Sequence, residues 1–332
     1  MLWNNAELHN VAELEPAGEG GSRILRLPAS LRATLNENAR NFAVHSSGVE
    51  VRFNLAPGAT ARLTLAEGNG LTAEVYQGCF RVKAPGLTRA PKTIEITQSP
   101  KQALLNALSG KHNLPFDSQL TRVLLPATAP VRLISLEGDI TPPRPEQLPR
   151  QRYLAYGSSI THGDSACRPS GIYTMLTARH LGADLVNHGY GGGAHLEETM
   201  ARYLAGLTWD FATLEMGINI GDWPIEKFAA GVERFVDIIS SAHPDKWIFC
   251  IDVYPFYEDL KREPGVHCRG FRPVVRDIVK KLNRPRVVHV DATTILTDIT
   301  GLSHDLVHPT DDGFAEMATN LAAAIGRTMK PA

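Results

Sequence analysis

The chain has 332 residues, of which 43% are hydrophobic and 21% charged, and its 34 Lys and Arg residues nearly balance its 35 Asp and Glu residues. This composition is typical of a globular protein with a sizeable core, and it excludes disorder, a collagen-like repeat or a coiled coil as a description of the whole chain. Because the net charge of −1 creates no general field for nucleic acid or an anionic membrane, we expect neither as a partner.

The cysteines and the first residues indicate the compartment. The cysteines lie far apart and form no CxxC pair, which argues against a disulfide framework or a zinc ribbon and favours free thiols in a reducing compartment. They are Cys79, Cys167, Cys250 and Cys268. Residues 1–16 have no basic or apolar segment of the signal-peptide kind, and no apolar run reaches the roughly 18 residues of a membrane helix. We therefore expect a cytoplasmic protein.

Up to about residue 138 the hydrophobic pattern has a period of two. In residues 49–55, VEVRFNL, apolar and polar side chains alternate, and similar short runs recur around residues 63–65, 94–96 and 131–136. Turn-forming pairs such as Pro-Gly and Ser-Gly lie between them. Short alternating strands of this kind predict an antiparallel β-sandwich or jelly roll, interrupted by one short helix around residues 99–108.

A proline-rich segment follows this region. Residues 141–149, TPPRPEQLP, read as a stiff, extended linker, because proline lacks an N–H and restrains the residue before it. We therefore divide the chain into a β-sandwich accessory domain (1–140), a linker (141–150) and a second domain (151–332).

In the second domain, expected strands and helices alternate. The strands are expected at 153–156, 184–187, 211–216, 247–253 and 286–290, and the helices at 171–181, 196–204, 224–240, 271–282 and 312–329. This alternation predicts a three-layer α/β fold with a parallel, flavodoxin-like sheet. Ligands of such sheets bind beyond the carboxyl ends of the strands.

Polar residues and glycines occupy those strand ends. GSSIT (157–161) follows the first strand, NHGYGGG (187–193) the second and GIN (217–219) the third, while DLVH (305–308) precedes the last helix. Each signal alone has another explanation: a serine can cap a helix, an Asn can stabilise a turn, and glycines can cradle a phosphate. The glycine spacing is not GxGxxG, however, and no GK[ST] occurs.

A metal site is the other alternative for the last segment. His304 and His308 are four residues apart, but Pro309 keeps them from sharing a helix and no third ligand is evident. We therefore expect no metal and no cofactor.

Taken in order, these segments resemble the blocks of the SGNH, or GDSL-type, hydrolase family over about residues 152–328. Two positions depart from the family pattern. Ser158 replaces the Asp of the family's GDS block. Ile220 replaces the Asp of the family's GxND block, while the Asn of that block is retained as Asn219. The N-terminal half more loosely resembles the β-sandwich that precedes some carbohydrate-esterase members.

The resemblance implies a serine esterase. Its blocks assign Ser159 as the nucleophile in preference to Ser158, His308 as the general base and Asp305 as the acid that orients His308.

The resemblance also implies an oxyanion hole. It would consist of the backbone N–H groups of Ser159 and Gly192 and the side chain of Asn219, with Gly191 as a near alternative to Gly192.

The substrate is less closely indicated. The attached sandwich and the family resemblance favour short-acyl esters, above all acetyl esters, of a small carbohydrate. Aromatic residues near strand ends could stack on a sugar; Tyr190, Trp223 and Tyr254 are our candidates for substrate binding, with Trp209 and Phe256 nearby in the sequence. An acyltransferase and a non-catalytic sugar-binding protein are the alternatives, and the oligomeric state stays open, a homo-oligomer included.

Overall fold

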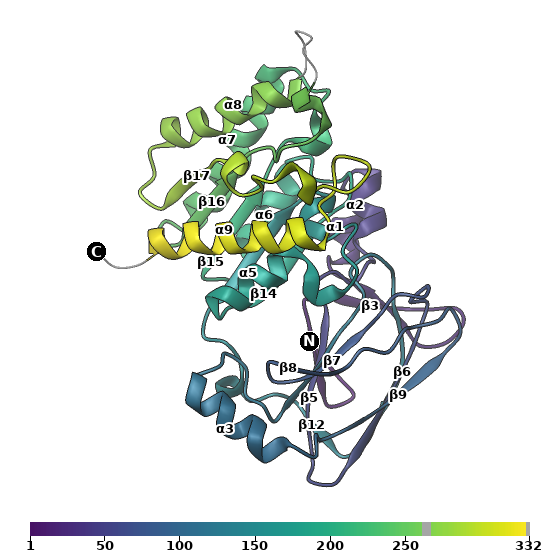
Figure 1. Ribbon diagram of the computed structural model, residues 1–332. Coiled ribbons are helices and arrows are strands. Elements are labelled where there is room, and N and C mark those ends of the chain that lie inside the picture. The colour runs from purple at the N-terminus through teal and green to yellow at the C-terminus, as the bar shows by residue number, and fades with distance from the viewer. Residues whose placement is uncertain (261–266, 330–332) are drawn as a thin grey trace.

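The computed structural model describes residues 1–260 and 267–329 and contains two parts, an antiparallel β part and a parallel α/β part (Figure 1). No helix in these ranges is both long enough and apolar enough to cross a membrane. Cys79, Cys167 and Cys250 are free thiols, whereas the side chain of Cys268 lies outside the described residues.

The β part contains two antiparallel sheets. The first runs in the order β1-β2-β5-β10-β7-β8, with β12 also paired to β5. Its strands are β1 (Leu2–Trp3), β2 (Ala6–His9), β5 (Glu50–Leu55), β7 (Glu74–Gln77), β8 (Phe80–Lys83), β10 (Leu120–Leu124) and β12 (Ile140–Thr141). The second runs in the order β3-β4-β11-β6-β9. Its strands are β3 (Glu13–Pro16), β4 (Ser22–Leu25), β6 (Thr60–Ala66), β9 (Lys92–Thr97) and β11 (Arg132–Glu137).

The two sheets share one apolar core, which makes the β part a sandwich. Val51 and Phe53 of the first sheet and Leu63 and Leu65 of the second belong to the same buried cluster. The predicted all-β region is therefore present, while the narrower expectation of a jelly roll stays a prediction. The expected helix is α3 (Gln102–His112).

The polar face of β5 is buried, although its alternation is typical of a strand with one face in water. This face lies against the edge strand β14 (Asp184–Gly189) of the α/β part. Arg52 donates two hydrogen bonds to Asp184, at 2.9 and 2.6 Å, and one to Glu50, at 2.8 Å, while Arg122 donates to Glu50 at 2.7 Å. Burial opposes ionisation of Glu50, but Arg122 and Arg52 lower its pKa to about 2. Paired charges thus join the two parts.

The α/β part confirms the predicted parallel sheet. The strand order is β14-β13-β15-β16-β17, with every neighbouring pair parallel. Numbered within this part, the order is 2-1-3-4-5, that of flavodoxin-like doubly wound sheets. Besides β14, the strands are β13 (Arg152–Gly157), β15 (Phe211–Glu215), β16 (Trp247–Ile251) and β17 (Val287–Val290).

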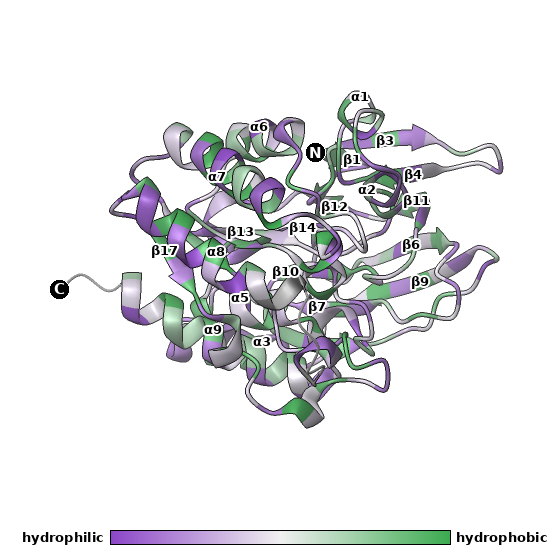
Figure 2. Ribbon diagram, turned by 90° about the horizontal axis from the view of Figure 1, so that it is seen from above, coloured by the Kyte–Doolittle hydropathy of each residue, from purple (hydrophilic) through white to green (hydrophobic). Residues whose placement is uncertain are grey.

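Helices cover both faces of this sheet, which gives three layers. One buried cluster joins one face to α6 (Glu198–Gly206), α7 (Ile225–Ala242) and α8 (His267–Leu282), and another joins the opposite face to α5 (Tyr173–Leu181) and α9 (Asp311–Met329). Both green and purple turns are visible along α7 and α9 in Figure 2, as expected of helices that bury one side.

A short helical segment of the N-terminal half joins the α/β core. Leu27, Leu35, Ala39 and Ala43, which flank or lie in α1 (Ala29–Arg32) and α2 (Glu37–Phe42), belong to the buried cluster of α6 and α7 (Figure 1). The expected linker is also held in place. It contains a short 3-10 turn (Pro145–Gln147), and Gln147 exchanges hydrogen bonds with Asn54 of β5 at 3.0 and 2.8 Å.

Candidate active site

The carboxyl edge of the parallel sheet gathers the sequence segments that suggested chemistry. Ser159 begins α4 (Ser159–His162) directly after β13, Gly192 lies in the loop after β14, and Asn219 lies in a 3-10 turn after β15. His308 lies in the loop before α9. These four residues line one cavity of about 460 Å³.

Ser159, His308 and Asp305 form a continuous hydrogen-bonded chain. His308 Nε2 lies 2.8 Å from Ser159 Oγ, and His308 Nδ1 lies 2.7 Å from Asp305 Oδ2. A carboxylate on Nδ1 keeps a proton on that nitrogen and leaves Nε2 able to accept the serine proton. The arrangement therefore suits nucleophilic attack by a serine hydroxyl.

The Asp305 carboxylate is held by its own loop. Its Oδ1 accepts hydrogen bonds from the Ser303 hydroxyl at 2.8 Å and from the backbone N–H groups of Val307 and His308 at 2.9 Å each. Partial burial disfavours the charge, but the hydrogen bonds from His308, Val307 and Ser303 hold the pKa of Asp305 well below its usual range. Asp305 is therefore ionised at neutral pH. Asp311 instead accepts from the Cys167 backbone.

The segment GSSIT (157–161), called the serine loop below, is held in place by a carboxylate that the sequence patterns did not single out. Glu215, the last residue of β15, is 2% exposed. Its Oε2 accepts from the Ser158 backbone at 2.6 Å, the Ser158 hydroxyl at 2.8 Å and the Thr161 hydroxyl at 2.9 Å. Burial raises the pKa of Glu215, although these hydrogen bonds oppose the rise.

Glu215 also accounts for two features of GSSIT. A Cβ at Gly157 would lie 2.3 Å from Glu215 Oε2, so only glycine fits there. The departure at Ser158 has a structural counterpart as well, since the Ser158 hydroxyl caps α4 by accepting from Ile160 and donates to Glu215. The sequence signal was a charged residue at the end of an otherwise apolar strand.

Three candidate hydrogen-bond donors belong to residues that line this cavity, Ser159, Gly192 and Asn219. Asn219 Oδ1 accepts from the Ala194 N–H at 3.1 Å, which leaves the amide nitrogen as the end available to a ligand. Within the described part of the chain, the backbone N–H groups of Ser159 and Gly192 donate no hydrogen bond. Gly192 has a φ of +63°, a conformation that favours glycine. Gly191 lines the same cavity.

The glycine-rich loop after β14 is packed by the N-terminal half. A Cβ at Gly193 would lie 2.6 Å from the backbone nitrogen of Ala39 in α2, and Asn38 donates to the Gly192 carbonyl at 3.1 Å. The buried Arg26 donates to the carbonyls of Asn187 and Gly189, at 3.0 Å each. These glycines therefore allow the close approach of α2.

The remaining lining of the cavity is mixed in character. Ile218, Phe256, Tyr257 and Val307 contribute apolar and aromatic surface. Asn38, Phe42 and Asp164 also line the cavity, the first two contributed by the N-terminal half. The Asp164 carboxylate is held 2.8 Å from Nδ1 of the buried His162. Sequence reasoning missed these three residues because none of them follows a strand of the sheet.

The structure corrects the expectation that Tyr190, Trp223 and Tyr254 contact the substrate, because none of them lines this cavity. Tyr190 is fully buried, with the Arg26 guanidinium 4.8 Å from its ring centroid. Tyr254 is 1% exposed within the core. Trp223 packs under Lys227, whose ammonium nitrogen lies 3.7 Å from the ring centroid. Of the aromatic residues named from the sequence, Phe256 does line the cavity. Among the described residues, no three His, Cys, Asp or Glu side chains form a group that could hold a metal ion.

Comparison with known families places this site in context. Residues 150–326 match the GDSL-like Lipase/Acylhydrolase family. The chain belongs to this family. The match confirms the resemblance drawn from the sequence blocks and makes the protein a member of an acylhydrolase family. No curated protein sequence matches the chain.

Solved structures share the fold of this family member over nearly its whole length. The salicylyl-acyltransferase SsfX3 from a tetracycline biosynthetic pathway has a TM-score of 0.78 at 19% identity, with 97% of this chain and 95% of that chain covered. A family two carbohydrate esterase from Clostridium thermocellum, solved with cellohexaose, has a TM-score of 0.61 at 16% identity, with 97% and 99% covered. The acetyl xylan esterase Est2A from the rumen bacterium Butyrivibrio proteoclasticus has a TM-score of 0.59 at 12% identity, with 99% and 96% covered. At these identities the likeness concerns the fold, the β-sandwich included.

Proposed function

We propose that the protein is a serine esterase that cleaves short-chain, above all acetyl, esters of a carbohydrate. The observation that carries this proposal is the hydrogen-bonded chain from Ser159 Oγ through His308 to Asp305. Family membership supports the acylhydrolase chemistry. Fold neighbours described as carbohydrate esterases, one of them an acetyl xylan esterase, support the choice of substrate.

The reaction proceeds through an acyl-enzyme. Ser159 Oγ attacks the ester carbonyl carbon while His308 Nε2 takes the hydroxyl proton. Asp305 stabilises the resulting imidazolium, which then gives the proton to the departing alcohol oxygen. Water attacks the acyl-enzyme by the same route in reverse, with His308 again as the base, and releases the acid and Ser159.

The negative charge on the tetrahedral intermediate is balanced by fixed donors. The N–H groups of Ser159 and Gly192 and the Asn219 side-chain amide supply them. The Asn219 amide needs no rearrangement, because Ala194 already fixes its orientation. Asn219→Ala is expected to lower kcat by about 10²–10³-fold with a smaller effect on KM.

The proposal is tested by identifying the nucleophile. Ser159→Ala is expected to lower p-nitrophenyl acetate turnover by up to about 10⁶-fold, the scale seen for a triad serine, and to abolish labelling by a fluorophosphonate. Peptide mapping of the labelled wild-type protein is expected to locate the probe on Ser159. A probe on Ser158, or full activity of Ser159→Ala, would show the assignment to be wrong.

The orienting acid has matched controls in its own neighbourhood. Asp305→Asn is expected to lower kcat by up to about 10⁴-fold, because the amide favours the wrong imidazole tautomer. The single variants Asp311→Asn and Asp312→Asn make the same chemical change at neighbouring positions, and both are expected to keep the activity. Loss of turnover in one of these controls but not in Asp305→Asn would reassign the acid.

An acyltransferase is the second candidate. The apolar side chains of Ile218, Phe256 and Val307 in the cavity lining suit a larger acyl group, and the acyltransferase SsfX3 is among the fold neighbours. Product analysis with acetylated sugars and a panel of acceptor alcohols separates the two. Free acid as the main product supports the esterase, whereas a new ester formed in preference to acid supports the transferase.

A further inference from the structure

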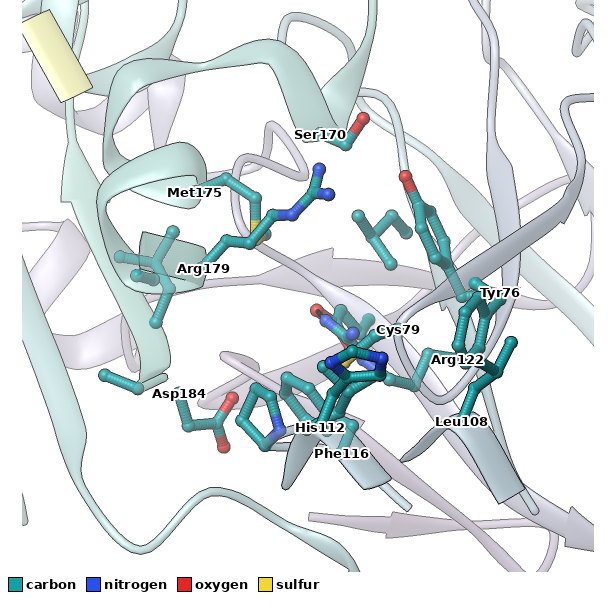
Figure 3. A pocket seen from close by; sticks show the side chains of 18 residues that line it. Tyr76, Cys79, Leu108, His112, Phe116, Arg122, Ser170, Met175, Arg179 and Asp184 are labelled. Carbon is teal, nitrogen blue, oxygen red and sulfur yellow. Dashed lines mark hydrogen bonds and ion pairs between the residues drawn. The ribbon is translucent and has the colours of Figure 1, made fainter. Parts of the chain in front are cut away.

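A second cavity, of about 490 Å³, lies between the two parts of the molecule and shares no lining residue with the active-site cavity. Its walls come from β5, β7, β8 and β10 of the sandwich, from α3 and the segment after it, and from the 3-10 turn Pro169–Gly171, α5 and β14 of the α/β part. Figure 3 shows its side chains converging from these elements. A volume of this size is typical of a small-molecule site.

Most of this cavity is apolar. Its apolar lining combines aliphatic, aromatic and thioether side chains from both parts: Phe80, Leu108, Leu114, Phe116, Met175 and Leu185. Leu108 lies on α3, a helix that has no buried residue, and it is 42% exposed. The polar side chains of Gln102 and Asn106 on α3 form hydrogen bonds with Ser118, and a bound apolar group would add apolar packing by covering Leu108.

One side of the cavity carries a guanidinium group and two hydroxyl groups. In Figure 3 the Arg179 guanidinium, the Ser170 hydroxyl and the Tyr76 hydroxyl lie on the same side of it. Arg179 is solvent-exposed and forms no ion pair with any described residue. The two carboxylates in the lining are already occupied, since Glu50 accepts from Arg122 and Asp184 from Arg52. The cation that remains without a partner therefore favours an anionic ligand.

We propose that this cavity binds a small apolar monocarboxylate, such as an aromatic or short fatty acid. The carboxylate accepts hydrogen bonds from Arg179 and from the hydroxyls of Ser170 and Tyr76, while the apolar body lies between Leu108 and Met175. The charge on Arg179 selects an acid over its neutral amide, because hydrogen bonds between charged groups are the stronger ones. This proposal does not rest on the esterase activity and stands or falls separately.

The test uses 2-naphthoate and the full-length protein with ¹³C-labelled methionine methyl groups. Met175 lines the second cavity, whereas Met216 is buried in the core directly after β15, near Asn219, and reports on the active-site side. Naphthoate is expected to shift the Met175 signal, identified by its loss in Met175→Leu, in a saturable way and to leave the Met216 signal unchanged.

Two variants probe the contacts. Arg179→Gln is expected to weaken naphthoate binding by about tenfold or more and to leave the weaker binding of 2-naphthamide unaltered. Leu108→Trp, at an exposed position, is expected to fill the cavity and abolish the binding of both. Arg234→Gln, an exposed arginine of α7 outside the cavity, is expected to bind as wild type does.

The Met216 methyl signal of all three variants is expected to match that of the wild type, which shows that each one keeps the folded core. The proposal is overturned if millimolar naphthoate produces no saturable shift of Met175, if it shifts Met216 instead, or if Arg179→Gln binds naphthoate as tightly as wild type does.

Discussion

Glu50 and Glu215 are two carboxylates with the same burial and opposite behaviour. Each is at most 2% exposed. Glu50 lies at the junction of the two parts, where Arg122 and Arg52 lower its pKa to about 2 against the effect of burial. Glu215 lies beneath the serine loop, where its described partners are the neutral donors of Ser158 and Thr161, and burial raises its pKa.

The difference teaches that the partner, and not the depth, decides what a buried charge does. The charge of the ionised Glu50 is compensated by arginines, and this network joins the sandwich to β14. Breaking its ion pairs leaves a buried charge without a partner. Glu215 has no counter-ion among the described residues, and its carboxylate accepts from three donors of Ser158 and Thr161. A carboxylate with a raised pKa next to the proposed nucleophile Ser159 is typical of a functional site.

The largest effect is expected from removing a cation at the junction. Arg52→Met leaves Asp184 and part of Glu50 without a partner, so the free energy of unfolding in urea should fall by about 3–5 kcal/mol. Arg52→Met combined with Asp184→Leu should recover part of the loss. The matched control is Arg62→Met, whose partner Glu95 and own side chain are 64% and 57% exposed, and which should cost at most about 1 kcal/mol. Equal losses in Arg52→Met and Arg62→Met would refute the role of the network.

The pH dependence of the free energy of unfolding should distinguish the two carboxylates, because their expected contributions change in opposite directions. The pKa of Glu50 is lowered from 4.5 to about 2, so its contribution is full above pH 4.5 and is lost as the pH falls towards 2. That contribution is about 3 kcal/mol. The stability difference between wild type and Glu50→Gln should therefore shrink over this window.

Glu215 should behave in the opposite way. Its raised pKa means that the folded protein binds the proton more tightly, so the wild type should gain stability relative to Glu215→Gln as the pH falls towards 4.5. Chemical unfolding of the three proteins across this pH range measures both differences. A wild type that lost stability relative to Glu215→Gln as the pH fell would contradict the comparison.

The next largest effect is expected for Glu215→Gln, and it should be a fall in kcat. The amide keeps one acceptor oxygen but loses the charge, so the serine loop shifts slightly and kcat should fall by about 10–100-fold with little change in KM. Glu50→Gln, equally buried, should lose stability and keep its kcat. Steady-state kinetics, measured below the unfolding temperature of both variants, show whether kcat falls in Glu215→Gln and is kept in Glu50→Gln. An unchanged kcat in Glu215→Gln would make this carboxylate purely structural.

The smallest effect is expected at Ser158. Ser158→Ala removes one hydroxyl donor from Glu215 but keeps the backbone donor, a loss of about 1 kcal/mol or roughly fivefold in kcat. Thr161→Val removes the other hydroxyl and serves as the matched variant, with a similar loss. If Ser158→Ala were as inactive as Ser159→Ala, positioning through Glu215 could not explain the role of Ser158.

The sequence was most informative where a pattern is local. The alternation of strands and helices after residue 152 predicted the parallel sheet, and the strand ends indicated where Ser159, Asn219 and His308 would meet. The burial of the polar face of β5 could not be predicted from its alternation, because the Asp184 carboxylate that pairs with Arg52 lies 132 residues away in the sequence.

The remaining parts of the site depend on contacts between distant segments. Asn38 and Phe42 lie in α2, a helix of six residues that is too short for a clear periodicity. Its start is marked only by Asn36, whose side chain accepts from the Ala39 N–H. Tyr190 and Tyr254 follow strands, as binding residues often do, but the burial of their rings is decided by neighbours such as Arg26 that the local sequence does not reveal.

The insertion of α2 into the catalytic cavity determines how this protein could be redesigned. A fragment cut at residue 150, where the family match begins, would lose Asn38 and Phe42 from the cavity wall and Arg26 from the carbonyls beneath the glycine loop. Directed evolution of substrate preference would therefore need libraries that vary residues 38 and 42 together with 218 and 256. Domain-exchange experiments would likewise have to transfer the sandwich and the hydrolase fold as one piece.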